Sequence, residues 1–229
     1  MKKPICVHAL TIILLLFINY SCNKNAATQA PYLPMEVDAA AIIANAILPQ
    51  YGGMVGQIYN VQSIALIPAI CGTQKDSVLA GANQNNAVIL FNYHLLWHFS
   101  HTCGNNGLNA SFTGDNSYEG LNYISKDQTS GNWVYLNQST TCILTGSAVR
   151  SGNERLKGIG SNSFASTIEF NHVNITIDPL SKQIITGQLE VKMYDTSSND
   201  FYYNGNITFS GSNRATLILN SGRTYPFSW

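Results

Sequence analysis

Apolar and polar residues alternate from Cys71 to the carboxyl terminus, and this pattern restricts the fold more than any other feature of the chain. Successive side chains of a β-strand point to opposite faces, so each alternating run predicts a strand with one buried face. In residues 189–193, for example, Leu, Val and Met alternate with Glu and Lys. Short turns rich in Gly, Asn, Asp and Ser separate the runs and leave no room for crossover helices. We therefore expect each strand to pair antiparallel with the next.

Eleven alternating runs predict about ten strands in a domain that covers residues 71–229. We place them at residues 77–79, 87–99, 108–112, 118–125, 133–137, 141–149, 164–177, 189–193, 201–209, 215–219 and 225–229. The predicted fold class is mainly β, an antiparallel meander that forms a curved sheet, as a barrel-like or sandwich domain. In residues 164–177 the apolar phase slips from even to odd positions, which predicts a β-bulge near Asn171 and His172.

Residues 35–70 precede the sheet and have helical spacing instead. In residues 35–48 the apolar side chains fall three and four apart, and two acidic residues stand in the first turn, where they favour the positive end of the helix dipole. A second helical run begins at Met54, although residues 64–67 also fit a buried strand. We expect this segment to pack on the β domain, because it lacks the basic face that a membrane-surface helix needs.

The amino terminus carries an export signal. Two lysines precede an apolar run, and the small residue Ser21 stands directly before Cys22. The residues from Ile18 to Cys22 resemble the lipobox of bacterial lipoproteins, of the loose kind common in Bacteroidota. In that family the cysteine thiol is modified with diacylglycerol, the signal is cut before the cysteine, and the new amino terminus is usually acylated. Asn19 departs from the usual Leu of that motif, and the alternative is an ordinary cleaved signal peptide.

This resemblance implies the organisation of the first part of the chain. Residues 1–21 would be a lipoprotein signal peptide, Cys22 the lipidated residue, and residues 22–34 a tether without periodicity. Acyl chains such as palmitate would anchor the protein to a membrane without spanning it. The resemblance implies a location in the cell envelope, on the outer membrane, but does not say whether the protein lies on its periplasmic or its surface side.

Three further cysteines follow, in a compartment where disulfides form. Cys71 and Cys103 are each followed by Gly in turn-rich sequence, whereas Cys142 lies within a strand-like run. We predict a structural disulfide between Cys71 and Cys103 and a buried free thiol at Cys142.

His94, His98 and His101 form the only local group with metal-ligand character. On a helix, His94 and His98 would lie one turn apart and could share a zinc ion. The alternation across residues 89–100 favours a strand instead, in which these two residues lie roughly 13 Å apart, so no metal site is predicted. Asn92, His94 and His98 then share one face, which is either an ordinary solvated face of the sheet or the lining of a wet face or cavity that binds a ligand. If a ligand binds here, these three residues are the candidates to contact it.

No recognised catalytic signature is present. The chain lacks a nucleophile elbow, a P-loop and a dinucleotide fingerprint, so no catalytic residue or cofactor is assigned. Aromatic residues that could stack on sugars fall near predicted turns and strand ends, namely Tyr118, Tyr123, Trp133, Tyr135, Phe201, Tyr202 and Tyr203. In a β protein most such residues belong to the core.

The charge balance argues against nucleic acid as a partner. Loss of Lys2 and Lys3 with the signal would leave 10 basic and 12 acidic residues, a net charge of −2, with the basic residues scattered singly. We therefore expect a non-enzymatic binding or interaction module whose partner is a small apolar ligand, a glycan or an outer-membrane protein. Two alternatives from other classes are a glycan hydrolase of the envelope and a structural subunit of an outer-membrane complex.

Overall fold

The computed structural model describes residues 34–67, 70–83, 87–103, 107–138, 140–158, 163–197 and 200–229. The expected signal peptide, the lipidated Cys22 and the tether up to residue 33 lie outside the described residues. Residues from 34 onward belong to one compact unit.

Two helices open the described part of the chain, as predicted. Helix α2 (Glu36–Ile47) is followed by a short 3-10 turn, η1 (Pro49–Tyr51), and by helix α3 (Met54–Ala65). The chain reverses at Gly52, which has a φ of +70°, and the ring of Tyr93 packs where a side chain of residue 52 would lie. The alternative of a buried strand at residues 64–67 is wrong, because Ile64 is still part of α3.

The described residues from Gln74 onward form a single ten-stranded antiparallel sheet in which each strand pairs with the next, so the predicted meander is confirmed. The sheet is open, with β1 and β10 as its two edges, and is therefore neither a closed barrel nor a sandwich. The strands are β1 (Gln74–Ala82), β2 (Leu90–His101), β3 (Gly107–Glu119), β4 (Tyr123–Asn137), β5 (Cys142–Leu156), β6 (Ser163–Ile177), β7 (Ile184–Asp195), β8 (Tyr202–Gly211), β9 (Arg214–Leu219) and β10 (Thr224–Ser228).

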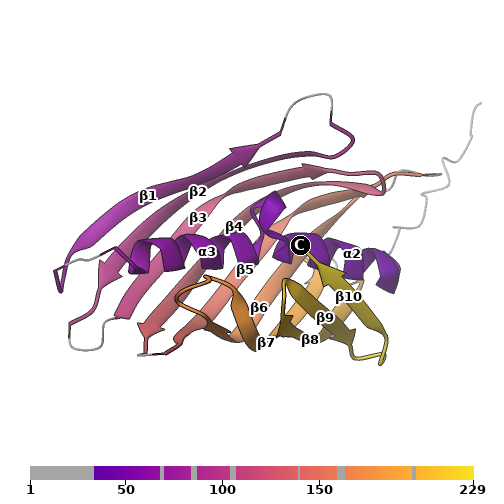
Figure 1. The fold of residues 1–229 in the computed structure, drawn as a ribbon. Helices are drawn as coiled ribbons and strands as arrows, with labels where there is room; N and C mark the ends of the chain where they lie inside the picture. The colour runs from indigo at the N-terminus through magenta and orange to yellow at the C-terminus, as the bar shows by residue number, and fades with distance from the viewer. Residues whose placement is uncertain are drawn as a thin grey trace, which may run out of the picture. The chain divides into compact units, whose positions relative to one another are not determined.

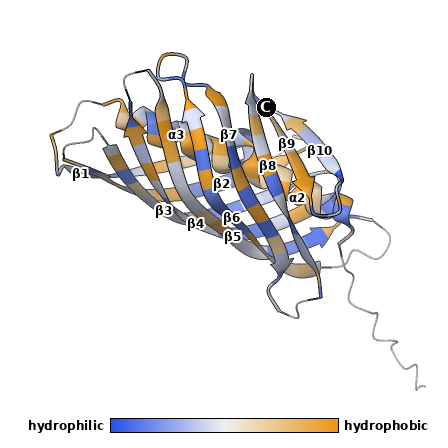
Figure 2. Ribbon diagram, turned by 90° about the horizontal axis from the view of Figure 1, so that it is seen from below, coloured by the Kyte–Doolittle hydropathy of each residue, from blue (hydrophilic) through white to orange (hydrophobic). Residues whose placement is uncertain are grey.

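The two helices lie against one face of this curved sheet, here called the inner face (Figure 1). Apolar residues of both helices form one core cluster with inner-facing apolar residues of strands β2 to β9. Hydrophobic and hydrophilic residues alternate along the strands accordingly (Figure 2). Hydrogen bonds add to the packing: Tyr123 accepts one from Asn45 of α2 at 2.6 Å, and Trp229 donates one to Tyr59 of α3 at 3.1 Å. The opposite face of the sheet, the outer face, carries the exposed residues.

Five strands, β1, β3, β4, β5 and β7, are several residues longer than the sequence predicts. The predicted strand at 118–125 is wrong, because the chain turns between Glu119 and Tyr123. Strands β3, β4 and β5 continue through segments for which the sequence pattern predicts loops. The reason is that the inner-facing residues there are polar: Asn116 in β3, Asp127 in β4 and Arg150 in β5 are all buried. A strand without apolar residues on its buried face gives no alternating signal.

The predicted bulge and disulfide are both present. The pairing of β6 with β7 slips between Asn171 and Asn174, and His172 adopts a φ of +50° at that point. Cys71 and Cys103 form a disulfide that joins the segment before β1 to the segment after β2, while Cys142 is a buried free thiol. The start of β1 is therefore covalently held to its neighbour.

Candidate functional site

The predicted ligand residues lie together on the outer face. In β2 the side chains of Leu95, Trp97 and Phe99 enter the core, so the intervening residues point the other way. Asn92, His94 and His98 are accordingly exposed on one face, as predicted.

The strand register extends this face into a lattice of four rows across β2, β3, β4 and β5. Each row contains residues that lie directly opposite one another in neighbouring strands. The first row is His98, Ser111, Asn132 and Ser147; the second is Leu96, Thr113, Ser130 and Val149; the third is His94, Asp115, Gln128 and Ser151; the fourth is Asn92, Ser117, Lys126 and Asn153. We call this lattice the outer-face trough.

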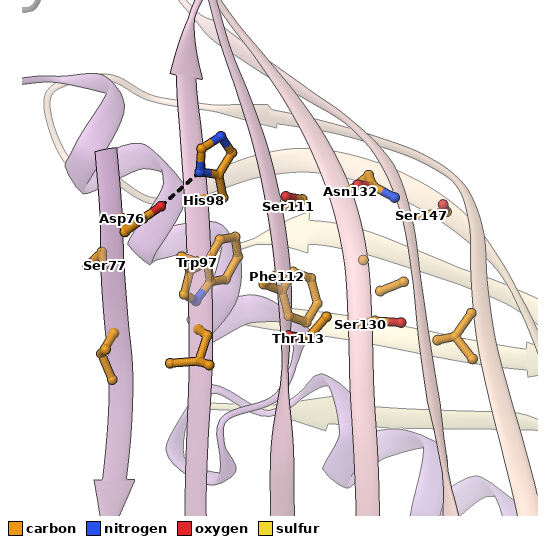
Figure 3. A pocket seen from close by; sticks show the side chains of 15 residues that line it. Asp76, Ser77, Trp97, His98, Ser111, Phe112, Thr113, Ser130, Asn132 and Ser147 are labelled. Carbon is orange, nitrogen blue, oxygen red and sulfur yellow. Dashed lines mark hydrogen bonds and ion pairs between the residues drawn. The ribbon is translucent and has the colours of Figure 1, made fainter. Parts of the chain in front are cut away.

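The trough is a chain of three open depressions that share lining residues. The depression between the first two rows also reaches Asp76 and Val78 of β1 and has a volume of about 690 Å³ (Figure 3). The next two, of about 460 and 750 Å³, continue it to the fourth row. Three of the four trough residues on β3 are small Ser or Thr side chains, and Ser130 lies beside them on β4, whereas the bulkier His94, Leu96 and His98 border them on β2. This difference in side-chain size hollows the surface.

The lining of the trough is polar but nearly neutral. Ten of its sixteen residues carry a hydroxyl or a carboxamide, and its ionisable residues are Asp115, Lys126, His94 and His98. At the β1 end, Nδ1 of His98 lies 2.8 Å from Oδ1 of Asp76. Trp97 and Phe112 also line this depression but are buried, so they expose little surface to it. Recognition at this surface would therefore rely on hydrogen bonds from hydroxyl and amide groups.

The histidines do not converge. His94 and His98 stand in different rows of the same strand, and within the described residues no three His, Cys, Asp or Glu side chains are grouped as metal ligands.

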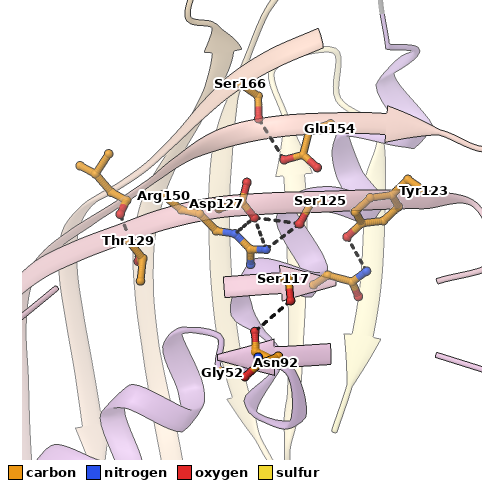
Figure 4. Close-up of polar contacts among 12 residues, drawn as sticks. Gly52, Asn92, Ser117, Tyr123, Ser125, Asp127, Thr129, Arg150, Glu154 and Ser166 are labelled. Carbon is orange, nitrogen blue, oxygen red and sulfur yellow. Dashed lines mark hydrogen bonds and ion pairs between the residues drawn. The ribbon is translucent and has the colours of Figure 1, made fainter. Parts of the chain in front are cut away.

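A second polar group lies on the inner face and is buried. The guanidinium of Arg150 binds the carboxylate of Asp127, with Nε 2.6 Å from Oδ2, and donates a hydrogen bond to Oγ of Ser125 at 3.0 Å (Figure 4). Oγ of Ser125 in turn donates to Oδ2 of Asp127 at 2.8 Å, and Ser166 donates to Oε1 of Glu154 at 3.2 Å. We call Ser125, Asp127, Arg150, Glu154 and Ser166 the buried ionic cluster.

Glu154 is the least well satisfied member of this cluster. It is 1% exposed, and its Oε2 has no hydrogen-bond partner in the described part of the chain. Burial, together with the negative charge of Asp127, raises the pKa of Glu154 to about 8, although Arg150 acts in the opposite direction. Glu154 is therefore mainly protonated at neutral pH. Two acids do converge here, but they lie in the core, with the Asp127 side chain only 1% exposed.

The bulge carries a third polar group, at the far side of the outer face. His172 lies 3.0 Å from a carboxylate oxygen of Glu190, and Tyr194 and Asn171 both donate hydrogen bonds to Glu169. A depression of about 570 Å³ adjoins Asn171, His172 and Glu190. His172 and Glu190 are largely exposed, so solvent weakens their interaction.

Most of the aromatic residues considered for sugar stacking are core residues. Tyr118, Tyr123, Trp133, Tyr135 and Phe201 are all buried, and only Tyr202 is well exposed. The expectation that most of these aromatic residues belong to the core is therefore confirmed, and those five cannot stack on a glycan at the surface. The trough residues on β3, β4 and β5 were missed because Ser, Thr, Asn and Gln carry no distinctive motif; only the register reveals that they adjoin Asn92, His94 and His98.

No protein-family model matches the chain, and no curated protein or solved structure is significantly similar to it. None of the helices in the described residues is long and apolar enough to cross a membrane.

Proposed function

We propose that this protein is a non-enzymatic binding module of the cell envelope, and that it binds its ligand in the outer-face trough. The observation that carries the proposal is the lining itself, a regular lattice of uncharged hydroxyl and carboxamide groups across four adjacent strands. Neutral donors and acceptors of this kind suit a ligand that is itself neutral and rich in hydroxyl groups. A glycan chain has that chemistry, so a glycan is the favoured ligand.

The dimensions of the trough suit an extended ligand. Its first and fourth rows are six residues apart along each strand, which corresponds to roughly 20 Å. A shallow surface of this length accommodates several sugar units side by side, each bonded to a separate row. A small apolar ligand fits less well, because Leu96 and Val149 are the only apolar side chains in the four rows.

The other two candidate functions have less support. A glycan hydrolase needs two carboxyl groups in an accessible cleft, whereas Asp127 and Glu154 converge in the core. An assembly subunit would be favoured by a broad exposed apolar patch. The exposed large apolar residues occur on many different elements, with Val78 and Leu96 as directly opposed neighbours.

Binding is tested by blocking the trough. Ser130 is exposed at the centre of the lattice, so Ser130→Trp would fill the depression without entering the core. Thr208→Trp is the matched control, because Thr208 is an exposed residue of β8 outside the trough. We expect neutral glucan and mannan oligosaccharides to shift NMR signals of the trough residues in the wild type and in Thr208→Trp, but not in Ser130→Trp. Equal shifts in both variants, or none at the trough of the wild type, would refute the proposal.

We also propose that acylation of Cys22 holds this module on the outer membrane, which rests on the lipobox resemblance. Replacement of Cys22 by Ala is expected to release the protein from the membrane fraction into the soluble fraction after cell lysis. If the processed Cys22→Ala protein stayed with the membranes, the lipid anchor would be excluded.

A further inference from the structure

We infer that β1 is a pairing edge, and that two copies of this chain join antiparallel through their β1 strands to form one continuous sheet. This inference is independent of the ligand in the trough. It starts from the position of β1 at one end of the strand order, with β2 as its only neighbour among the described residues. β1 lies along the border of the sheet in Figure 1.

The register identifies the backbone groups at this edge. Thr73 accepts a hydrogen bond from His101 at 3.0 Å, and Asn83 donates one to Phe91 at 3.3 Å. In an antiparallel pair the backbone groups of successive residues point alternately toward the partner and away from it. Odd-numbered residues of β1 therefore bond to β2, and the N–H and C=O groups of the five even-numbered residues face the free edge. These are Gln74, Asp76, Val78, Ala80 and Ala82.

The two edges of the sheet differ in their protection. β10 has five residues and contains Pro226, which lacks an N–H group and is a common device against edge pairing. β1 has nine residues and no proline, and within its span the pairing with β2 is regular, without a bulge. Its start is also held to β2 by the Cys71–Cys103 disulfide. A long, regular and covalently positioned edge is a ready template for another strand.

The sequence of β1 is compatible with its own copy. Pairing of all nine residues places Val78 on a two-fold axis, opposite Val78 of the second copy. In this register Asp76 faces Ala80 and Lys75 faces Gly81, so no like charges meet. A register shifted toward the start of the strand would instead place Asp76 opposite itself, which costs free energy through like-charge repulsion. Full overlap and charge complementarity thus select the same register.

Exposed apolar surface lies at the same point. Val78 is 55% exposed and Leu96, directly opposite it in β2, is 53% exposed. Pairing about Val78 would bring the two copies of this apolar pair side by side on the outer face, where the two Val78 side chains contact each other and lose part of their exposure. Antiparallel pairing also keeps the outer faces of both copies on the same side, so the two troughs would share one surface. A single strand pair buries little area, so we expect a dimer that dissociates on dilution.

Cysteine cross-linking in the full-length chain, expressed in cells, tests the register. In an antiparallel hydrogen-bonded pair the Cα atoms lie about 5.5 Å apart, within disulfide range. Val78→Cys should therefore form a disulfide-linked dimer upon mild oxidation. Ala82→Cys is the matched control: it is exposed on the same face of the strand, but its two copies would lie roughly 27 Å apart. Cross-linking of both variants to the same extent, or of neither, would overturn the inference.

Sedimentation analysis of the purified protein tests the backbone pairing. Val78→Pro removes an N–H group that faces the free edge and leaves the bonds to β2 intact, whereas Val78→Thr keeps that N–H group. With two hydrogen bonds lost per dimer, we expect Val78→Pro to weaken the dimer about tenfold or more and Val78→Thr to retain it. Circular dichroism confirms that each variant is folded. A wild type that stays monomeric at all concentrations, as it would if another segment of its own chain covered β1, would also overturn the inference.

Discussion

The protonation of Glu154 makes the stability of the fold depend on pH in an unusual direction. Most paired carboxylates stabilise a fold as pH rises, because their pKa is lowered in the native state. Glu154 is buried beside Asp127, and its pKa is raised to about 8. Glu154→Gln replaces the protonated acid with a neutral side chain of nearly the same shape. The variant therefore isolates the cost of ionising this residue in the core.

The sign and size of the effect follow from linkage. Between the ordinary glutamate pKa of 4.5 and about 8, the native state holds a proton that the unfolded state has lost. Stability is therefore fully present below the unfolded-state pKa and falls as pH rises through this window, by up to about 1.4 kcal/mol per pH unit. Across the window the Glu154 contribution amounts to on the order of 3–5 kcal/mol. The glutamine variant lacks this loss.

Urea unfolding between pH 5 and pH 9, with the disulfide intact, measures the effect. We expect wild type and Glu154→Gln to have similar stability near pH 5, and the variant to be the more stable protein at pH 9 by on the order of 3–5 kcal/mol. Glu119→Gln is the control, because Glu119 is an exposed carboxylate whose pKa is lowered by Lys157. Its removal should leave the slope above pH 5 unchanged. Identical pH slopes for wild type and Glu154→Gln would refute the raised pKa.

Two further perturbations test the interior. Arg150→Met would leave the carboxylate of Asp127 buried without its ionic partner. Loss of one member of a buried ion pair typically lowers the free energy of unfolding by about 3–5 kcal/mol. Thermal unfolding measures this loss, and a variant midpoint close to that of the wild type would contradict the importance of this pair. Removal of the disulfide by a Cys71→Ala, Cys103→Ala double substitution should cost about 2–4 kcal/mol, because the bridge closes a long loop. A reducing agent should lower the thermal unfolding midpoint of the wild type to that of the double variant, and should leave the midpoint of the double variant unchanged.

The sequence alone was sufficient for the class of fold and for several of its details. Period-two alternation predicted an antiparallel meander, helical spacing predicted α2 and α3, and a slip in the apolar phase located the bulge at His172. The context of Cys71 and Cys103 predicted the disulfide. The strands, the helices and the bulge could be predicted because each depends on the face that successive side chains occupy, and this face follows from the local order of residues.

The candidate site was predictable only in part. Asn92, His94 and His98 were placed on one face because they belong to one strand. Ser111, Ser130 and the other trough residues could be identified only from the register between strands, because this register brings together residues that are far apart in the chain. The same holds for the edge at β1, since a strand is an edge only when no other strand pairs beside it.

The amino-acid sequence by itself determined that the chain would form a twisted run of antiparallel strands preceded by two helices, because the periodicity of side-chain polarity selects secondary structure residue by residue. Only the tertiary structure decided that the sheet stays open with the helices on its inner face, and that Asp127, Arg150 and Glu154 are buried there. Polar residues give the same sequence signal whether they face water or one another. The difference between a solvated loop and a buried ionic cluster lies in partners supplied by other strands, and these exist only once the sheet is assembled.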